Sequence, residues 1–396
     1  MKFKDLLRKY QAGEVNDDEK RQVEAELEKY EALEAYFAEQ WEFPLPDPAA
    51  ADPQEEEARQ IIKSVNSRLR KIVLTSVMII TACLLSIVFI ISPLVDSFYY
   101  NPTKVSVGSR EDDINFDLAA LIELTQPGYA LAGLAETDKL GFGRYDSYFY
   151  RTNLLTQETA EITMRIKRNK NYSKDLFRVE QPHFTAVEAP GFLSDVDLAR
   201  QKERVLNHLR QLNPVAYAAA YLTFENDLSM DELEDLVVQK NHFLDFVWAG
   251  IRTAPQGQRM DFLSGFNLRP NTVFHSGDQP DTARYPAFLF WDWLTGNEGL
   301  PPGSSGRARW AVAAELHYKS LLRYLADRKE AVTALSNHPR QHQYYQAALA
   351  YVEEHGVYSY GVLVHATAAD LIKLVETAPI KTLELDQVLA SRRFIQ

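Results

Sequence analysis

The sequence predicts an α+β protein in three parts: a helical N-terminal arm, one transmembrane helix, and an extracytoplasmic α+β domain. We expect that domain to have a ferredoxin-like βαββαβ core carrying a large insertion. Three observations lead to this prediction. One long run has no charged residue, a glutamate-rich helical pattern precedes it, and strand-like segments alternate with capped helices after it.

The uncharged run Ile72–Val95 reads IVLTSVMIITACLLSIVFIISPLV and has 24 residues. As a helix it would measure about 36 Å, which exceeds the hydrocarbon core of about 30 Å. A secretory signal peptide is disfavoured, because such apolar regions are shorter and lie at the N-terminus. A buried core helix is disfavoured by the length without charge. The run therefore predicts a membrane span, which Pro93 is expected to kink.

The residues that flank the run predict its orientation. Four basic residues precede it: Lys63, Arg68, Arg70 and Lys71. The aromatic trio Phe98-Tyr99-Tyr100 and residues of both charges follow it. Positive charge stays on the cytoplasmic side, and aromatic rings settle at the interface. We expect a single-pass protein of the cell membrane, with its N-terminus cytoplasmic and its C-terminus extracytoplasmic.

Composition narrows the classes of function. The 396 residues include 55 acidic and 43 basic side chains, for a net charge of -12, which argues against nucleic-acid binding. Cys83 is the single cysteine and lies in the apolar run. The sequence therefore offers no disulfide, no zinc cluster of cysteines and no cysteine nucleophile.

Motifs of catalysis are missing from the sequence. His338 and His342 are four residues apart, but Pro339 lies between them and no His-Glu-x-x-His motif is present. No nucleophile elbow, phosphate loop or dinucleotide fingerprint occurs. His365 lies in an apolar strand segment and is interpreted as a core histidine. We expect no enzyme, with no catalytic residue, no cofactor and no metal.

The arm, residues 1–43, reads as two helices. Lys2–Tyr10 forms the first, which Gly13 ends, and Asn16 caps a second with acids in its first turn. Apolar residues at helical spacing form one stripe: Leu6, Leu7, Tyr10, Val23, Leu27, Tyr30, Leu33 and Phe37. Two short helices bury too little surface to be firmly stable alone. The stripe is therefore a candidate partner-binding surface, and packing of the helices on each other or dimerisation is the alternative.

Residues 44–71 form a linker and a juxtamembrane helix. A proline-rich stretch, Pro44–Pro53, is expected to be extended. Asp52 then caps a helix that has Pro53 at its first position and Glu55 three residues after the cap. This helix is expected to run through Arg70 into the membrane span, residues 72–95.

Beyond the span, residues 96–212 form a predicted strand-rich region that begins at Ile114. Tyr145–Thr152 and Ile162–Lys167 alternate apolar and polar residues, as half-buried strands do. Leu193–Leu212 reads as a helix that closes this region.

Residues 213–396 contain two similar strand–helix–strand units. The first joins strands Tyr217–Phe224 and Leu244–Ile251 through a helix opened by the capping box at Ser229. The second joins Tyr358–Ala366 and Ile380–Val388 through a helix capped at Thr367. Two such units predict a ferredoxin-like sheet. Residues 252–355 would be an insertion between the units, with helices near its end.

The arm resembles the N-terminal region of bacterial membrane anti-sigma factors that restrain extracytoplasmic-function sigma factors. Tyr10 and Gly13 match that pattern, whereas Glu26, Tyr30 and Leu33 occupy the positions of the family's zinc ligands, so the metal site is absent. The stretches GEVNDDEK and ELEKYE are similar to the zinc-free regulators of Firmicutes.

The C-terminal part resembles the C-terminal domain of the same regulators. The stretches VAYAAAYLTFENDLSMDELEDLV and LDFVWAGIRT carry this resemblance, as does EEHGVYSYGVLVHATAADLIKLVETAPIKTLELDQV. Two resemblances on either side of one membrane span reinforce each other.

The resemblance implies an anti-sigma factor. Its arm would hold an extracytoplasmic-function sigma factor through the apolar stripe, and its outer domain would respond to cell envelope stress. Membrane lipid, a membrane co-regulator and a protease are further expected partners, and nucleic acid is not. The alternative is a membrane-anchored surface binding or sensor module with a different cytoplasmic partner. An envelope enzyme with a degenerate site is disfavoured.

Overall fold

The computed structural model describes the following residues: 10, 17–41, 53–107, 110–173, 184–188, 190–241, 244–260, 262–269, 273–274, 278–295, 306–336 and 338–392. They divide into two compact units, Met1–Thr81 and Ala82–Gln396.

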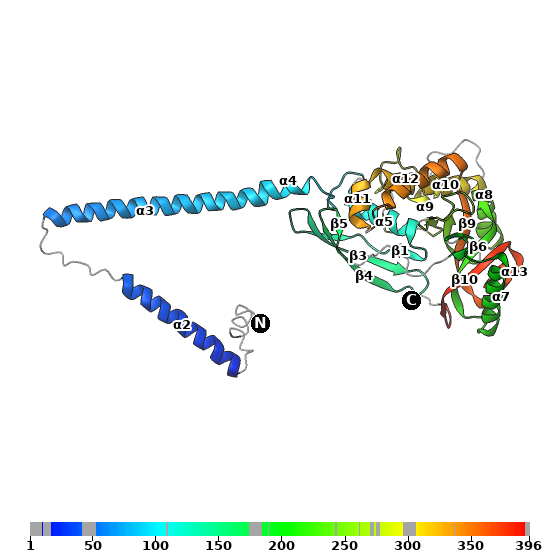
Figure 1. The fold of residues 1–396 in the computed structure, drawn as a ribbon, viewed down its shortest axis with the longest axis horizontal. Coiled ribbons are helices and arrows are strands. Elements are labelled where there is room, and N and C mark those ends of the chain that lie inside the picture. The colour runs from blue at the N-terminus through cyan, green and yellow to red at the C-terminus, as the bar shows by residue number, and fades with distance from the viewer. Residues whose placement is uncertain are drawn as a thin grey trace. The chain divides into compact units, whose positions relative to one another are not determined.

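The smaller unit is helical, as predicted. Helix α2 covers Asp17–Trp41, and helix α3 covers Pro53–Ser86 and continues into the larger unit (Figure 1). The predicted helix Lys2–Tyr10 lies outside the described residues apart from Tyr10, which is helical. Helix α3 starts at Pro53 and passes through Arg70 into the apolar run, which confirms that prediction.

One helical stretch in the described part of the chain, Ile61–Asp96, is long and apolar enough to cross a membrane. It consists of α3, a π-helical turn Ile87–Ile91 and the short helix α4, Ser92–Asp96. The π turn lies just before Pro93. Proline has no N–H and its ring clashes with the carbonyl four residues earlier, so the helix widens at this point. The expected effect of Pro93 is thus a local change of helix type.

After the apolar helix, the larger unit continues with a helix where the sequence predicted strands. Helix α5 covers Asp113–Thr125, and every one of its residues is buried. A helix that is buried on all sides has no polar face and so lacks a clear 3.6-residue period, which explains the wrong interpretation from Ile114 onward. The strand-rich region begins only at Tyr129.

The first sheet is antiparallel and has five strands. They are β1 Tyr129–Leu131, β2 Glu136–Lys139, β3 Arg144–Asn153, β4 Thr159–Lys167 and β5 Lys170–Asn171. The two predicted strands correspond to β3 and β4, which pair from Arg144↔Lys167 to Thr152↔Thr159. Along β3, Tyr145, Ser147 and Phe149 are buried in the predicted period of two.

The second sheet has the strand order β10-β6-β9-β7-β8, and all neighbours are antiparallel. Its strands are β6 Tyr217–Ser229, β7 Asp245–Ile251, β8 Gly265–Asn267, β9 Tyr358–Thr367 and β10 Ile380–Leu389. The strands of the two predicted units interleave, so β9 lies between β6 and β7. Helix α7, Asp195–Gln211, packs against the edge strand β10.

Both predicted helix starts are present in the second sheet's units. Ser229 forms a capping box with Glu232 at the start of α8, Met230–Glu234, which continues as a π helix to Lys240. Thr367 accepts a hydrogen bond from the Asp370 N–H and caps α13, Ala368–Thr377. The capping chemistry read from the sequence is confirmed at both positions.

Between β7 and β9, the described regular elements are the short strand β8 and four helices, with turns and irregular segments between them. The helices are α9 Phe290–Thr295, α10 Gly306–Asp327, α11 Lys329–Leu335 and α12 Gln341–His355. The short strand β8 extends the sheet beyond β7. One continuous apolar core joins α5, both sheets and α10, so the larger unit folds around a common centre. The α+β class is confirmed.

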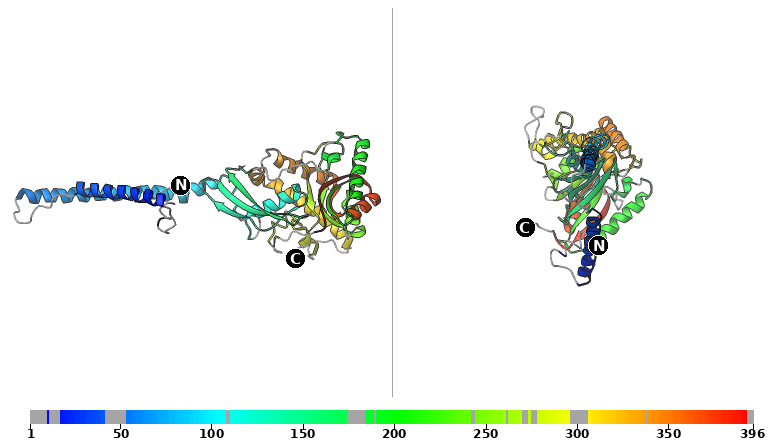
Figure 2. Two further views of the ribbon diagram at one scale, coloured as in Figure 1. Left: turned by 90° about the horizontal axis from the view of Figure 1, so that it is seen from below. Right: turned by 90° about the vertical axis from the view of Figure 1, so that its left-hand side faces the viewer.

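The larger unit has two distinct ends. In Figure 1 and in the view from below, β3 and β4 reach toward the end of the unit where α4 emerges (Figure 2). Helices α7 and α13 lie at the opposite end. The first sheet is therefore the part of the unit nearest to the end of the apolar helix.

Candidate functional site

The predicted partner-binding stripe is described only in part. Val23 is buried, whereas Leu27 is 39% and Tyr30 is 65% exposed. The half-buried Tyr10 donates a hydrogen bond from its hydroxyl to Glu24 Oε1 over 3.4 Å. Leu6, Leu7 and the side chains of Leu33 and Phe37 lie outside the described residues.

These observations divide the stripe into two roles. Val23 is buried, and Tyr10 contacts Glu24 on α2. Leu27 and Tyr30 are accessible and remain the described candidates for a partner. Two exposed large apolar side chains one turn apart on a charged helix are the pattern of a helix-in-groove ligand.

A second candidate site lies where the apolar helix enters the larger unit, and we call it the junction. Ser92 and Asp96 are one helical turn apart and both are buried. Ser92 Oγ accepts a hydrogen bond from the Phe142 N–H at 3.1 Å. Asp96 Oδ1 accepts one from the Gly143 N–H at 2.6 Å, and Asp96 Oδ2 lies 3.1 Å from Lys139 Nζ. The helix end is thus bonded to the β2–β3 turn.

The β2–β3 turn has an unusual backbone that suits this contact. Gly141, Phe142 and Gly143 have φ values of +77°, +58° and +70°. A Cβ atom on Gly141 would lie 2.7 Å from Ser92 Oγ, and one on Gly143 would lie 2.9 Å from the Tyr99 ring. Glycine is required at both positions because any other residue would strain the backbone and collide with the helix end.

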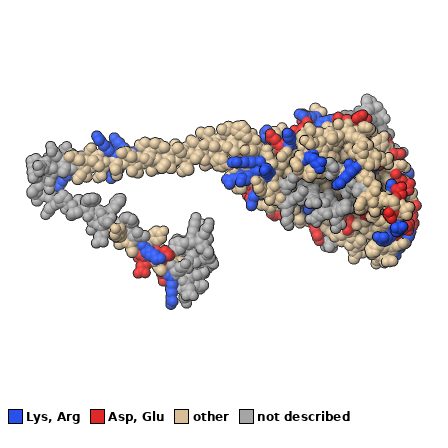
Figure 3. Space-filling view, viewed as in Figure 1, with Lys and Arg blue, Asp and Glu red and all other residues tan. Residues whose placement is uncertain are grey.

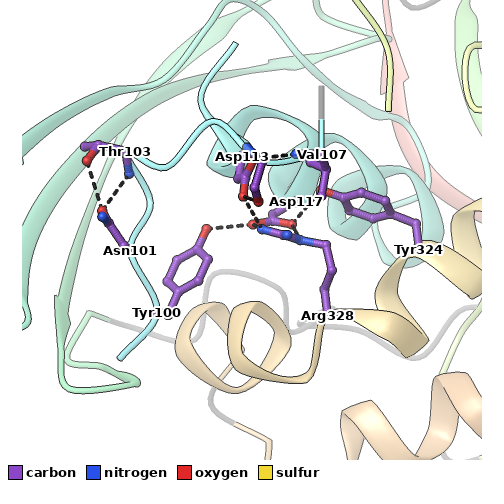
Figure 4. A network of polar contacts seen from close by, with 9 residues as sticks. Tyr100, Asn101, Thr103, Val107, Asp113, Asp117, Tyr324 and Arg328 are labelled. Carbon is purple, nitrogen blue, oxygen red and sulfur yellow. Dashed lines mark hydrogen bonds and ion pairs between the residues drawn. The ribbon is translucent and has the colours of Figure 1, made fainter. Parts of the chain in front are cut away.

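A buried polar network continues from the helix end into the domain (Figure 4). The Tyr100 hydroxyl donates to Asp117 Oδ2 at 2.7 Å, and the Tyr324 hydroxyl donates to Asp117 Oδ1 at 2.8 Å. The Arg328 guanidinium donates to both oxygens of Asp117, with Nη2 at 2.8 Å from Oδ2. Arg328 Nη2 also lies 3.3 Å from Asp113 Oδ2.

The network joins three parts of the unit that are far apart in sequence. Tyr100 follows the apolar helix, the two aspartates lie on α5, and Tyr324 and Arg328 lie at the end of α10. Asp113 Oδ1 additionally accepts hydrogen bonds from the Ser106 N–H at 2.7 Å and the Val107 N–H at 3.1 Å. Described residues of the segment between the apolar helix and α5 are therefore held by α5 itself.

Burial controls the protonation of this network. Burial, and then the nearby Asp117 carboxylate, raises the pKa of the Tyr100 and Tyr324 hydroxyls well above their ordinary value. Burial would lower the pKa of Arg328, but the charge of Asp117, its hydrogen bonds to Arg328 and the two nearby phenols together outweigh burial and raise that pKa. Both phenols stay protonated as donors and Arg328 stays charged, which satisfies both oxygens of the buried carboxylate.

Sequence reasoning did not find the junction or this network. Asp113 and Asp117, one turn apart in the largely apolar segment DINFDLAALIELT, were the available signal. Buried carboxylates need partners, so this pattern calls for a cation elsewhere in the chain. The distance to Arg328, more than 200 positions away, hid that cation from a local pattern.

Four of the described histidines lie in structural surroundings. His342 Nε2 lies 2.8 Å from the Ala326 carbonyl oxygen, and the His338 ring packs edge-on against Phe262. His365 is buried as predicted, and burial, with the nearby Arg269, lowers its pKa to about 3. His317, on α10, contacts Glu123 Oε1 at 2.9 Å and the Ala287 carbonyl at 2.8 Å. The described residues contain no group of three or more His, Cys, Asp or Glu placed to hold a metal ion.

Comparison with known proteins found a match, and it covers the part of the chain that contains the second sheet. A family model described as sigma factor regulator C-terminal matches residues 209–387, from the last turn of α7 to β10. The match confirms the resemblance that the sequence of the C-terminal part shows to the sigma factor regulators, and it supports that family for residues 209–387. No curated protein and no solved structure matches the chain.

Proposed function

We propose that this protein is a single-pass membrane anti-sigma factor. Its cytoplasmic arm would sequester an extracytoplasmic-function sigma factor and hide the surfaces used for core polymerase or promoter DNA. Its larger unit would lie outside the cell, and as this outer unit it would respond to an envelope signal. In this proposal the chain acts by binding and not by catalysis. The match of residues 209–387 to the regulator family carries the proposal, since it implies a sigma factor as the partner.

The charges around the apolar helix support a cytoplasmic arm. Lys63, Arg68, Arg70 and Lys71 are exposed on α3 just before the uncharged run. Basic residues stay on the cytoplasmic side of a span. The domain matched by the family model would then lie outside the cell.

We also propose that the second sheet is a ferredoxin-like core. The order β10-β6-β9-β7, with all neighbours antiparallel, is the order that two interleaved βαβ units produce. Leu233 of α8 and Leu371 of α13 belong to the same apolar cluster as Ala220 of β6, which fits two helices covering one face.

The junction supports a mechanical role for the outer unit. Because the helix end is bonded to the β2–β3 turn and to the α5 network, a rearrangement of the unit would move the helix. Coupling between distant sites in proteins operates through packed elements that have two alternative arrangements. Release of the partner would follow from this movement, from exchange with a membrane co-regulator or from proteolysis.

Co-purification from membranes tests the proposal. The full chain is co-expressed with candidate extracytoplasmic-function sigma factors, extracted in detergent and captured through a C-terminal tag. We expect one sigma factor to co-purify, and Leu27→Asp to abolish its capture because the substitution places a charge in the apolar contact.

Ala25→Asp is the matched control, because it adds the same charge to an exposed position on the opposite face of α2. We expect this variant to retain the sigma factor. Capture of no sigma factor, or equal capture by both variants, would contradict the proposal.

The alternative is a membrane-anchored surface module with another cytoplasmic partner. The exposed Leu27 and Tyr30 would serve such a partner equally well. The same experiment separates the two functions, because the alternative predicts capture of a different protein that Leu27→Asp releases and no capture of any sigma factor.

A further inference from the structure

Two adjacent turns at the end of the apolar helix carry only basic charge. The β2–β3 turn reads KLGFGR from Lys139 to Arg144, and the β4–β5 turn reads KRNK from Lys167 to Lys170. The turns lie side by side, since Arg144 pairs with Lys167 and the Arg168 N–H donates to the Gly143 carbonyl at 2.7 Å. Neither turn contains an acidic residue.

The contacts of the junction set the depth of these turns. The Phe142 N–H bonds to Ser92, which lies inside the apolar run and three residues before its end at Val95. Three helical residues correspond to about 4.5 Å. If the run crosses a membrane, the tip of the β2–β3 turn therefore lies at the level of the lipid headgroups. The Tyr100 N–H, bonded to Asn169 Oδ1 at 2.6 Å, holds the β4–β5 turn beside it.

The exposed side chains here are those that an interface selects. Leu140 at the tip is 50% exposed and Phe98 beyond the helix end is 70% exposed. Arg144, Lys167, Arg168 and Lys170 are exposed around them. Figure 3 shows Lys and Arg atoms gathered at the end of the larger unit where the apolar helix emerges (Figure 3). Apolar and aromatic groups ringed by basic ones bind membrane surfaces that contain anionic lipid.

We propose that these two turns dock the outer unit onto anionic lipid headgroups beside its own membrane helix. The inference rests on the membrane placement in the proposed function but not on the identity of the cytoplasmic partner. Docking would hold the junction in one orientation relative to the bilayer. The outer unit could then move only if the two turns detached from the headgroups.

Fluorescent labelling of the full chain in vesicles tests this proposal. On a Cys83→Ser background, single cysteines replace Leu140, Phe98 or Val196, and each is labelled with an environment-sensitive dye. Val196 is 67% exposed and belongs to α7, the helix that Figure 1 shows at the end of the unit opposite α4. The vesicles are phosphatidylcholine alone or with phosphatidylglycerol, and nitroxide-bearing lipids act as quenchers.

We expect lipid quenching at Phe98→Cys in both vesicles and none at Val196→Cys. At Leu140→Cys we expect quenching that is strong with phosphatidylglycerol and weaker without it. The combined Lys167→Glu, Arg168→Glu and Lys170→Glu change should abolish that difference, since each basic charge strengthens docking about fivefold. The matched reversal of Arg200, Arg204 and Lys240, which lie outside the two turns, should leave it unchanged.

Two results would overturn the proposal. If Leu140→Cys stays unquenched in both vesicles while Phe98→Cys is quenched, the turns do not dock on lipid, and a protein partner becomes the better occupant. If Phe98→Cys itself is not quenched, the membrane placement is wrong and docking fails with it. Neither result bears on the capture of the sigma factor, because co-purification measures that capture separately.

Discussion

At the scale of single residues, the Asp117 carboxylate on α5 is held by three side chains that come from two other parts of the larger unit. It is fully buried, and Arg328, Tyr100 and Tyr324 supply its hydrogen-bond donors. A buried ion pair adds little net stability by itself, but removal of one partner leaves an uncompensated buried charge. The network therefore acts chiefly to fix one arrangement of α5, α10 and the helix end.

Arg328→Met tests this interpretation. We expect a loss of about 3 kcal/mol in the free energy of unfolding, because the Asp117 charge loses its cation in a buried site. Chemical unfolding of the full chain in detergent measures it. Arg323→Met is the control, since Arg323 bonds Glu353 at the surface at 2.6 Å and exposed pairs contribute less than about 1 kcal/mol. Equal losses in the two variants would show that the network does not hold the fold.

His365 predicts a dependence of stability on pH. Its pKa falls to about 3 on folding, whereas an unfolded histidine titrates near 6.5. Between these values the unfolded state binds more protons, so stability decreases as the pH falls below about 6.5. From pH 7 to pH 5 this one group should cost about 2 kcal/mol.

The measurement is the unfolding free energy of the native chain and of His365→Gln at both pH values. We expect the variant to lose about 2 kcal/mol less than the native chain over this range. An identical pH dependence in both proteins would show that His365 is not held neutral in the fold.

At the scale of elements, the junction depends on a backbone that only glycine adopts easily. Gly143 combines a φ of +70° with a close approach to the Tyr99 ring. Gly191 has a similar φ of +79°, but nothing lies within 4 Å of its Cβ position. Comparing substitutions at Gly143 and Gly191 therefore distinguishes the effect of backbone strain from the effect of a collision near the helix end.

Gly143→Ala should detach the β2–β3 turn from the helix. We expect faster hydrogen exchange at the amides of residues 142 and 143, which bond Ser92 and Asp96, and at Tyr100. Gly191→Ala should cost about 1–2 kcal/mol of strain without any change at those amides. Unchanged exchange in Gly143→Ala would mean that the turn does not depend on that close approach.

The elements that the sequence predicted correctly are those with strong local signals. Capping residues Ser229 and Thr367 marked two helices, and alternation marked β3 and β4. Helix α5 was wrong because burial on all sides removes the period on which the prediction depends. The three-residue strand β8 was missed because its pairing with β7 comes from tertiary packing.

The candidate sites differ in the same way. The arm's stripe could be proposed from the sequence because its spacing is local. Leu27 and Tyr30 are exposed on α2, and their role in partner binding stays a prediction. The junction was not readable, since Ser92 and Asp96 bond backbone groups about 50 residues away. Every residue except proline has a backbone N–H, so a contact to that group does not require a particular residue type as donor. The signals in the sequence were the two glycines that the turn requires.

At the scale of the whole molecule, each unit has its own task in the proposed function. The smaller unit has accessible apolar side chains. In the larger unit, the β2–β3 turn is hydrogen-bonded to the end of a helix that is long and apolar enough to cross a membrane. The family match lies entirely in the larger unit. Sequestration of a sigma factor is therefore the claim on which the account depends most.

Competition with core RNA polymerase measures sequestration most directly. The full chain in lipid nanodiscs is mixed with its co-purifying sigma factor and with core polymerase, and the complexes are separated by size. We predict that the sigma factor leaves core polymerase for the nanodiscs, and that with Leu27→Asp it stays on core polymerase. A stable complex of nanodisc, sigma factor and core polymerase together, or no binding to the nanodisc, would contradict the account.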